Sequence, residues 1–116
     1  MKTKNVKIEK RERRHKRIRA RLSGTAERPR LAVFKSNTFM YAQLINDDKG
    51  VTIAHGTTKG LKGGTKLERA KLLGKSMAEK AKEKKVKKVV FDRAGFVYAG
   101  KIKAVAEGAR EGGLEF

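Results

Sequence analysis

Residues 31–57, LAVFKSNTFMYAQLINDDKGVTIAHGT, contain three runs rich in β-branched, aromatic and other apolar side chains, separated by two polar stretches. The runs are LAVFK (31–35), FMYAQLI (39–45) and VTIAHGT (51–57), and the SNT and NDDKG stretches between them have the composition of turns. Gly50 suits the positive φ that closes a longer hairpin loop. Because short links join the runs, this segment predicts an antiparallel meander of three strands.

The second run also predicts which side chains of the sheet are buried. Met40, Ala42 and Leu44 alternate with a mixed set that includes Tyr41 and Gln43. Since successive side chains of a strand point to opposite faces, the first set should face the core and the second should lie in the open. Three of the phenylalanines, Phe34, Phe91 and Phe96, are expected to pack in the core.

The segment after the meander has the pattern of an amphipathic helix. Thr65 followed by Glu68 has the spacing of a capping box and places a helix start at Thr65. The apolar positions then step by three and four residues, and they are Ala70, Leu73, Met77 and Ala81. Small residues in this stripe indicate close packing on a sheet.

The C-terminal part predicts one more strand and one more helix. KVVFD (88–92) is too short for a helix and reads as a buried strand, and RAGFVYAG (93–100) reads as a loop. A second helical stripe follows, Ile102, Val105, Ala106 and Ala109, with Gly112 and Gly113 as its stop signal. Leu114 and Phe116 should fold back onto the core. The predicted order β-β-β-α-β-α makes an α/β fold, one mixed sheet with two helices on one face.

A basic N-terminal arm precedes this domain, and EKRERRHKRIRARL (9–22) is its most charged part. Residues 1–30 hold 13 Lys and Arg against 3 Asp and Glu. Their few apolar side chains make no continuous helical stripe, so we predict two regions. Residues 1–29 form an arm that is disordered or frayed when free and helical when bound, and residues 30–116 form the domain. The alternative is a solvated tail kept for solubility, which does not need side chains suited to phosphate geometry.

The formal net charge of +19 requires a polyanionic partner, either nucleic acid or an acidic membrane face. An interfacial helix needs a wide apolar face, which residues 9–22 lack, and no apolar run exceeds four residues, so we expect no membrane partner. The absence of cysteine is compatible with the cytoplasm. No helix-turn-helix, zinc-finger or heptad pattern indicates DNA, whereas a polar, partly aromatic sheet face suits irregular RNA.

Catalytic, metal and nucleotide sites are not supported. Gly74-Lys75-Ser76 resembles the end of a phosphate-binding loop, but position 69 is Arg and the triplet lies inside a predicted helix. His15 and His55 are far apart in sequence and have no second ligand at metal spacing. Asp92 stands beside Arg93, and it is better interpreted as a structural partner that fixes the loop than as a catalytic residue. We therefore predict no enzyme activity, no cofactor and no metal.

The candidate phosphate contacts are the basic side chains in and beside the arm. They are Lys10, Arg11, Arg13, Arg14, His15, Lys16, Arg17, Arg19, Arg21, Arg28 and Arg30.

Two stretches, residues 28–50 and residues 91–116 (FDRAGFVYAGKIKAVAEGAREGGLEF), resemble the bacterial form of large-subunit ribosomal protein eighteen. The resemblance covers nearly the whole chain. It implies a protein of the cytoplasmic ribosome that binds 5S rRNA and helps attach it to 23S rRNA in the central protuberance. It also implies contact with neighbouring 5S-associated proteins, and no homo-oligomer is expected.

Position by position, the resemblance implies RNA contacts at the first hairpin, the second strand and the loop before the last helix. These are Lys35, Ser36, Asn37, Tyr41, Gln43, Arg93, Tyr98 and Lys101. This chain departs from many family members at several positions: they have Lys-His where it has Thr38-Phe39, His where it has Ala99, and Arg where it has Lys101. Lys101 keeps the positive charge of that arginine, but it lacks the guanidinium group that can donate two hydrogen bonds to one phosphate. Two other readings remain open, a general nucleic-acid-coating protein and a structural scaffold without RNA.

Overall fold

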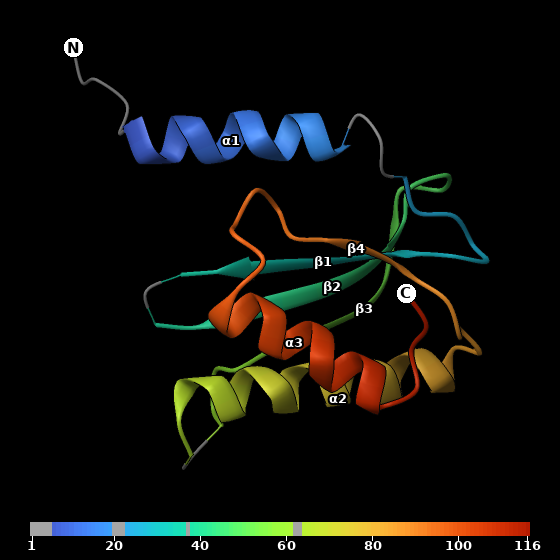
Figure 1. Ribbon diagram of the computed structural model, residues 1–116. Helices are drawn as coiled ribbons and strands as arrows, with labels where there is room; N and C mark the ends of the chain where they lie inside the picture. The colour runs from blue at the N-terminus through green and yellow to red at the C-terminus, as the bar shows by residue number, and fades with distance from the viewer. Residues whose placement is uncertain (1–5, 20–22, 37, 62–63) are drawn as a thin grey trace.

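The computed structural model describes residues 6–19, 23–36, 38–61 and 64–116, which form three helices and a four-stranded sheet (Figure 1). The elements are α1 (Val6–Arg19), β1 (Arg30–Lys35), β2 (Met40–Asn46), β3 (Val51–Thr57), α2 (Lys66–Glu83), β4 (Val90–Asp92) and α3 (Gly100–Glu111). Helices α2 and α3 cover one face of the sheet, and α1 lies on the opposite side (Figure 1). The predicted order of strands and helices and the α/β class are confirmed.

The sheet has the order β3-β2-β1-β4. The first three strands pair antiparallel as the predicted meander, with Gly50 in its second turn at a φ of 63°. Strand β4 pairs in parallel with β1, which places Ala32 beside Asp92. The register between β2 and β3 shifts at Leu44/Ile45, where a bulge interrupts the ladder.

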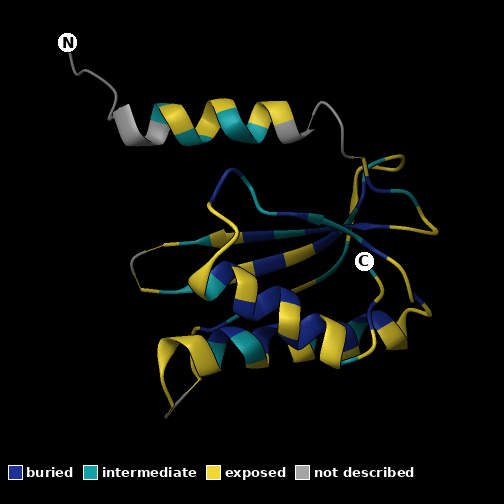
Figure 2. Ribbon diagram, in the orientation of Figure 1, coloured by how far each residue is buried: buried dark blue, intermediate teal, exposed yellow. Residues whose placement is uncertain are grey.

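The core lies between the sheet and the pair α2 and α3, as the dark-blue positions of Figure 2 show. On β2 the buried side chains are Met40, Ala42 and Leu44, and Tyr41 and Gln43 are exposed, as the alternation predicted. The predicted helical positions are all buried, and they are Ala70, Leu73, Met77, Ala81, Ile102, Val105, Ala106 and Ala109.

Helix α2 begins with the predicted capping box. The backbone N–H of Glu68 donates to the Thr65 hydroxyl at 3.2 Å, and the Thr65 N–H donates to the Glu68 carboxylate at 3.3 Å. Glycines let the two packed helices touch through their backbones: a Cβ at Gly74 would collide with the Val105 carbonyl oxygen of α3. This close packing sets how near α2 and α3 lie to each other.

The C-terminal prediction holds with one adjustment. Strand β4 begins at Val90 rather than at residue 88, because Lys88 forms an isolated parallel bridge with Glu115. The chain end does fold back, since Leu114 is buried and the Phe116 ring stacks on Phe91 with a centroid distance of 5.5 Å.

Candidate nucleic-acid interface

We call the side of the sheet opposite α2 and α3 the outer face, and it includes Phe34, Tyr41, Gln43, His55 and Thr57. The strand register sets them side by side: Phe34 pairs with Tyr41, Tyr41 with Thr57, and Gln43 with His55. Tyr41 and His55 are exposed, and so is Gln43. The outer face therefore combines an aromatic strip with hydrogen-bonding groups.

The prediction that Phe34 lies in the core is wrong, because its side chain is 46% exposed on the outer face. Leu31 and Val33 occupy inward positions of β1, and Phe34, which directly follows Val33, must therefore point to the opposite face. Phe96 is buried as expected and meets the Phe34 ring edge-on, with centroids 5.5 Å apart. Phe91 is half-buried and packs against the core.

Helix α1 packs against the loop between β4 and α3, without an apolar stripe. The Arg14 Nε donates to the Gly95 carbonyl at 2.9 Å, and the Arg11 guanidinium lies 4.7 Å from the Phe96 ring centroid and 5.7 Å from that of Phe34. A Cβ at Gly95 would collide with the Arg11 carbonyl oxygen, so the two backbones are in close contact. The arm was expected to offer no apolar stripe to a core, and the contacts of its described side chains are polar and cation–π rather than apolar.

The basic side chains of α1 consequently divide into two groups. Arg11, Arg14 and His15 are half-buried against the domain. The exposed group, which we call the outward cations, is Lys10, Arg13, Lys16 and Arg17. Among the α1 side chains that the structure describes, only the outward cations are positioned to meet a partner without first leaving the protein.

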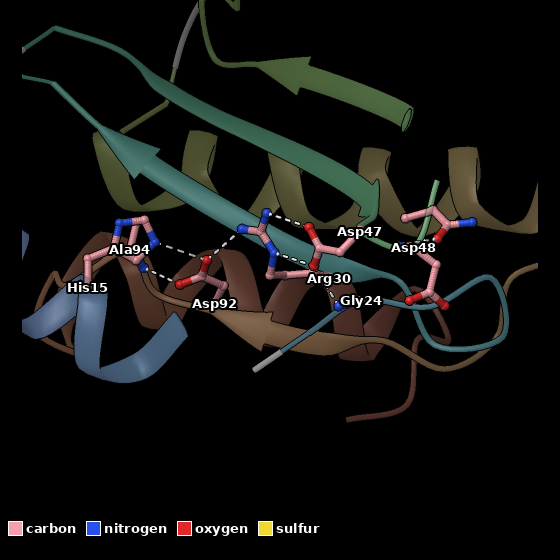
Figure 3. A network of polar contacts seen from close by, with 8 residues as sticks. His15, Gly24, Arg30, Asp47, Asp48, Asp92 and Ala94 are labelled. Atoms are coloured by element: carbon pink, nitrogen blue, oxygen red, sulfur yellow. Dashed lines mark hydrogen bonds and ion pairs between the residues drawn. The ribbon is translucent and has the colours of Figure 1, made fainter. Parts of the chain in front are cut away.

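A buried ion-pair network lies beneath α1 (Figure 3). The Arg30 guanidinium donates to both carboxylate oxygens of Asp47, at 3.0 and 3.1 Å, and to Asp92 at 2.7 Å. Burial acts to lower the pKa of Arg30, but the hydrogen bonds that Arg30 donates to Asp47 and Asp92, together with their charges, outweigh it and raise the pKa above its ordinary value. Arg30 was predicted to contact RNA; the structure instead places it in the interior, where it ties β1 to β4 and to the β2–β3 hairpin.

The two carboxylates of this network also hold neighbouring segments. The fully buried Asp92 accepts from the Ala94 N–H at 2.8 Å and lies 3.2 Å from the His15 Nε2, so it fixes the loop and receives α1. Asp47 accepts from the Gly24 N–H at 2.6 Å, which anchors the chain between α1 and β1. The interpretation of Asp92 as a structural partner is confirmed.

Two residues of the β4–α3 loop that were predicted to contact RNA, Arg93 and Tyr98, make contacts within the loop and with the elements beside it. The Arg93 guanidinium donates to the Phe96 carbonyl at 2.6 Å, and Arg93 is half-buried. Tyr98 is 40% exposed, its ring meets Phe91 edge-on at 5.8 Å, and its hydroxyl accepts from Arg110 at 3.4 Å. Tyr98 is thus partly exposed at the surface, whereas Arg93 braces the turn.

The remaining predicted residues are spread over the surface. The Ser36 hydroxyl donates to the Phe39 carbonyl at 3.0 Å and accepts from the Phe39 N–H at 3.1 Å, which closes the β1–β2 turn. Arg28 is exposed. Lys35 is partly exposed near that turn, and Lys101 is partly exposed in the first turn of α3. Asn37, Arg21 and the side chain of Arg19 lie outside the described residues.

Sequence reasoning missed Phe34 and Thr57 as outer-face residues, whereas His55 was interpreted as a strand-end surface residue or an RNA contact and is indeed exposed. The alternation of Leu31 and Val33 could have placed Phe34 on the outer face. For β3, the register shift at Leu44/Ile45 prevents a simple assignment of residues to the two faces. Within the described ranges, no helix is long and apolar enough to cross a bilayer, and no three His, Asp or Glu side chains gather as metal ligands.

Comparison with known proteins gives a consistent result. The family described as ribosomal L18 of archaea, bacteria, mitochondria and chloroplasts matches residues 5–116. The large ribosomal subunit protein uL18 of Clostridium botulinum (strain Loch Maree / Type A3) is 57% identical over 116 residues, covering 97% of this chain and 98% of the relative. The uL18 protein of Lactobacillus johnsonii is 57% identical over 106 residues, covering 89% of each chain.

Proposed function

Because this chain belongs to the ribosomal L18 family, we propose that it binds 5S rRNA and helps attach it to 23S rRNA in the central protuberance. As a bacterial member of the family it is a structural constituent of the large ribosomal subunit, in the cytoplasm, and not an enzyme. Its partners are the ribosome and rRNA, and the proposal extends them to 5S rRNA, 23S rRNA and neighbouring 5S-associated proteins.

The observation that carries the proposal is the position of the outward cations beside an exposed aromatic sheet face. Lys10, Arg13, Lys16 and Arg17 are exposed on α1, which lies on the side of the sheet opposite α2 and α3 (Figure 1). Tyr41 belongs to the outer face on that side, because it alternates with the buried Met40 and Ala42. Cations supply phosphate contacts, which set position and orientation, while exposed rings can stack on unpaired bases. This combination suits a folded RNA with loops and bulges better than a regular duplex.

The experiment compares the affinity of the full chain for 5S rRNA, tRNA and duplex DNA of similar length at physiological salt. We expect a preference of about 10³-fold for 5S rRNA over duplex DNA, the low end of specific nucleic-acid recognition. Equal affinities would overturn the proposal in favour of a general coating protein.

A pair of variants tests the outer face in the same assay. Tyr41→Ala should weaken 5S rRNA binding by about 1–3 kcal/mol if one base stacks on the ring. The matched control is Leu72→Ala, which removes a side chain of α2 that is 51% exposed on the other side of the sheet. If both variants bind as the unmodified chain does, the outer face does not stack RNA bases.

A further inference from the structure

Four lysines gather in the turn between α2 and β4, on either side of the buried Val86. They are Lys84, Lys85, Lys87 and Lys88, all four are exposed, and we call them the turn lysines. None of them is among the residues that the sequence and the family resemblance predicted as RNA contacts. The proposed function therefore leaves this dense group of cations without a role.

The turn lysines lie apart from the outer face and from the outward cations. Helix α2, which they follow, covers the side of the sheet opposite α1 (Figure 1). Its first residue, Lys66, lines one small hollow with Thr38 and Phe39 of the β1–β2 turn. From there the 18 residues of α2 carry the chain about 27 Å to the turn lysines. They are therefore available to a second segment of a partner.

The protein supplies no counter-charge to the turn lysines. Among the residues that the structure describes, no carboxylate forms an ion pair with any of them, whereas other lysines of the same domain are paired. Lys71 and Lys75 pair with Glu111, and Lys103 pairs with Glu107. Because unpaired like charges repel, the fold gains nothing from collecting the turn lysines in one place.

The helix dipole explains only the lysines that precede them. The carboxyl end of a helix carries a partial negative charge and favours cations, and Lys80 and Lys82 lie in the last turn of α2. This effect falls off within that turn. It therefore leaves Lys85, Lys87 and Lys88, which lie beyond the helix, unexplained.

Lys85 stands at a position that favours glycine. The Val86 N–H donates to the Ala81 carbonyl at 2.8 Å, and the Lys85 N–H donates to the Lys82 carbonyl at 3.0 Å. This is the Schellman pattern, and Lys85 is the residue directly after the C-cap Lys84. Its φ of 59° is left-handed, so the Cβ costs stability that glycine would not. Such strain is stored where a side chain has a function.

We propose that the turn lysines form a second RNA-binding site, which takes backbone phosphates of ribosomal RNA outside 5S rRNA. The inference rests on the proposed function and deepens it by assigning residues to the attachment of 5S rRNA to the larger RNA. Phosphates follow one another along a strand, so ammonium groups on one exposed turn can meet successive ones. Lysine offers a point charge on a flexible stem, which suits contacts that position an RNA without reading its sequence.

The triple variant Lys84→Gln/Lys87→Gln/Lys88→Gln tests the site in the full chain. The probe is 23S rRNA, titrated onto the complex of the chain with 5S rRNA. Each lost phosphate contact lowers the slope of log affinity against log salt by about 0.7–0.9, so the variant should lose about two to three units. The slope for 5S rRNA alone should stay unchanged, because other surfaces hold that RNA.

The matched control is Lys71→Gln/Lys75→Gln/Lys103→Gln, which removes the same charge from the same domain. These three lysines already pair with Glu107 and Glu111, so they are not free to meet phosphates. We expect the control to retain the slope of the unmodified chain for 23S rRNA.

Lys85→Gly separates binding from folding, because the two should change in opposite directions. Glycine relieves the left-handed strain, so the melting temperature should rise by about 4 °C. The slope for 23S rRNA should fall by about 0.8, because one phosphate contact is lost. A side chain kept only for the fold would lower the melting temperature when removed and leave the slope unchanged. Lys85→Arg, which keeps the charge, should retain the slope.

Equal slopes for the triple variant and its control would contradict the second site, and an acidic protein would become the alternative partner. A 5S rRNA complex of the unmodified chain that does not bind 23S rRNA would contradict it as well. So would a triple variant that loses slope on 5S rRNA alone, since the turn lysines would then belong to the 5S contact.

Failure of the proposed function is a separate outcome. It follows if the full chain does not prefer 5S rRNA over duplex DNA. In that case the slopes of the free triple variant and its control for 23S rRNA still decide whether the turn lysines bind RNA.

Discussion

Helices α1 and α2 are both rich in cations, yet they are held on the domain in opposite ways. Helix α2 buries a stripe made of Ala70, Leu73, Gly74, Met77, Ala78 and Ala81. Helix α1 is attached by Arg11, Arg14 and His15, whose contacts are cation–π interactions, a hydrogen bond to a loop carbonyl and a hydrogen bond between the His15 ring and Asp92. Figure 2 shows the contrast, with dark-blue positions along α2 and none among the coloured positions of α1.

This contrast separates a permanent attachment from one that can be exchanged. Apolar burial of a Leu-sized side chain stabilises by about 1.5–3 kcal/mol and needs no partner. An exposed cation–π contact or ion pair contributes about 0.5–1 kcal/mol, and salt weakens it. We infer that α2 belongs to the folded domain under all native conditions, whereas α1 can exchange its loop contacts for RNA phosphates.

The largest effect is expected from truncating the stripe of α2. Leu73→Ala removes a side chain that is 2% exposed and should lower the free energy of unfolding by about 2–5 kcal/mol. The counterpart in α1, Arg11→Ala, should lower it by about 1 kcal/mol or less. Urea denaturation of both variants measures the two values. Equal losses would mean that α1 is as much a part of the folded unit as α2.

An intermediate effect is expected at Gly95, where α1 approaches the loop. Gly95 has a φ of 79°, so Gly95→Ala should cost about 1–3 kcal/mol in backbone strain and also push α1 away. Gly60→Ala is the matched control, because Gly60 has a φ of 89° and nothing near its missing Cβ.

Hydrogen exchange of the α1 amides separates these two effects. Both glycine variants should be destabilised, but only Gly95→Ala should speed exchange in residues 6–19. Unchanged exchange in Gly95→Ala would show that α1 does not depend on this contact.

An effect no larger than that at Gly95 is expected from removing the arm, which takes away the contacts of Arg11 together with those of Arg14 and His15. We propose that residues 1–29 are an arm and residues 30–116 a domain that folds without it. A chain lacking residues 1–22 should lose only the helical circular dichroism of α1, keep a cooperative melting transition, and lose about 1–3 kcal/mol of unfolding free energy, since a few contacts of about 0.5–1 kcal/mol each disappear. Asp92 keeps Arg30 as its partner in that chain. Loss of the cooperative melting transition would contradict this division.

Local signals made much of the fold predictable. The capping box at Thr65 and Glu68, the alternation around Tyr41 and the glycine stop at Gly112 each depend on neighbours a few residues away. The first residue of β4 was harder to predict, because Lys88 pairs with Glu115, which is distant in sequence, rather than with β1.

The interface was less predictable, because its contacts join distant residues. Arg30 looked like one more basic side chain of the arm, and its burial depends on Asp47 and Asp92, which lie 17 and 62 residues away. The attachment of α1 was missed for a related reason. A guanidinium over a ring and a side-chain bond to a loop carbonyl leave no periodic pattern in the sequence.

The central claim is that the outward cations of α1 hold RNA phosphates, and the salt dependence of 5S rRNA binding tests it most directly. Four such contacts should add about three units to the slope of log affinity against log salt. The full chain should therefore lose affinity steeply with salt, and a chain lacking residues 1–22 should have a slope shallower by about three units. That shorter chain should still prefer 5S rRNA through the outer face. Equal slopes for the two chains would contradict the claim.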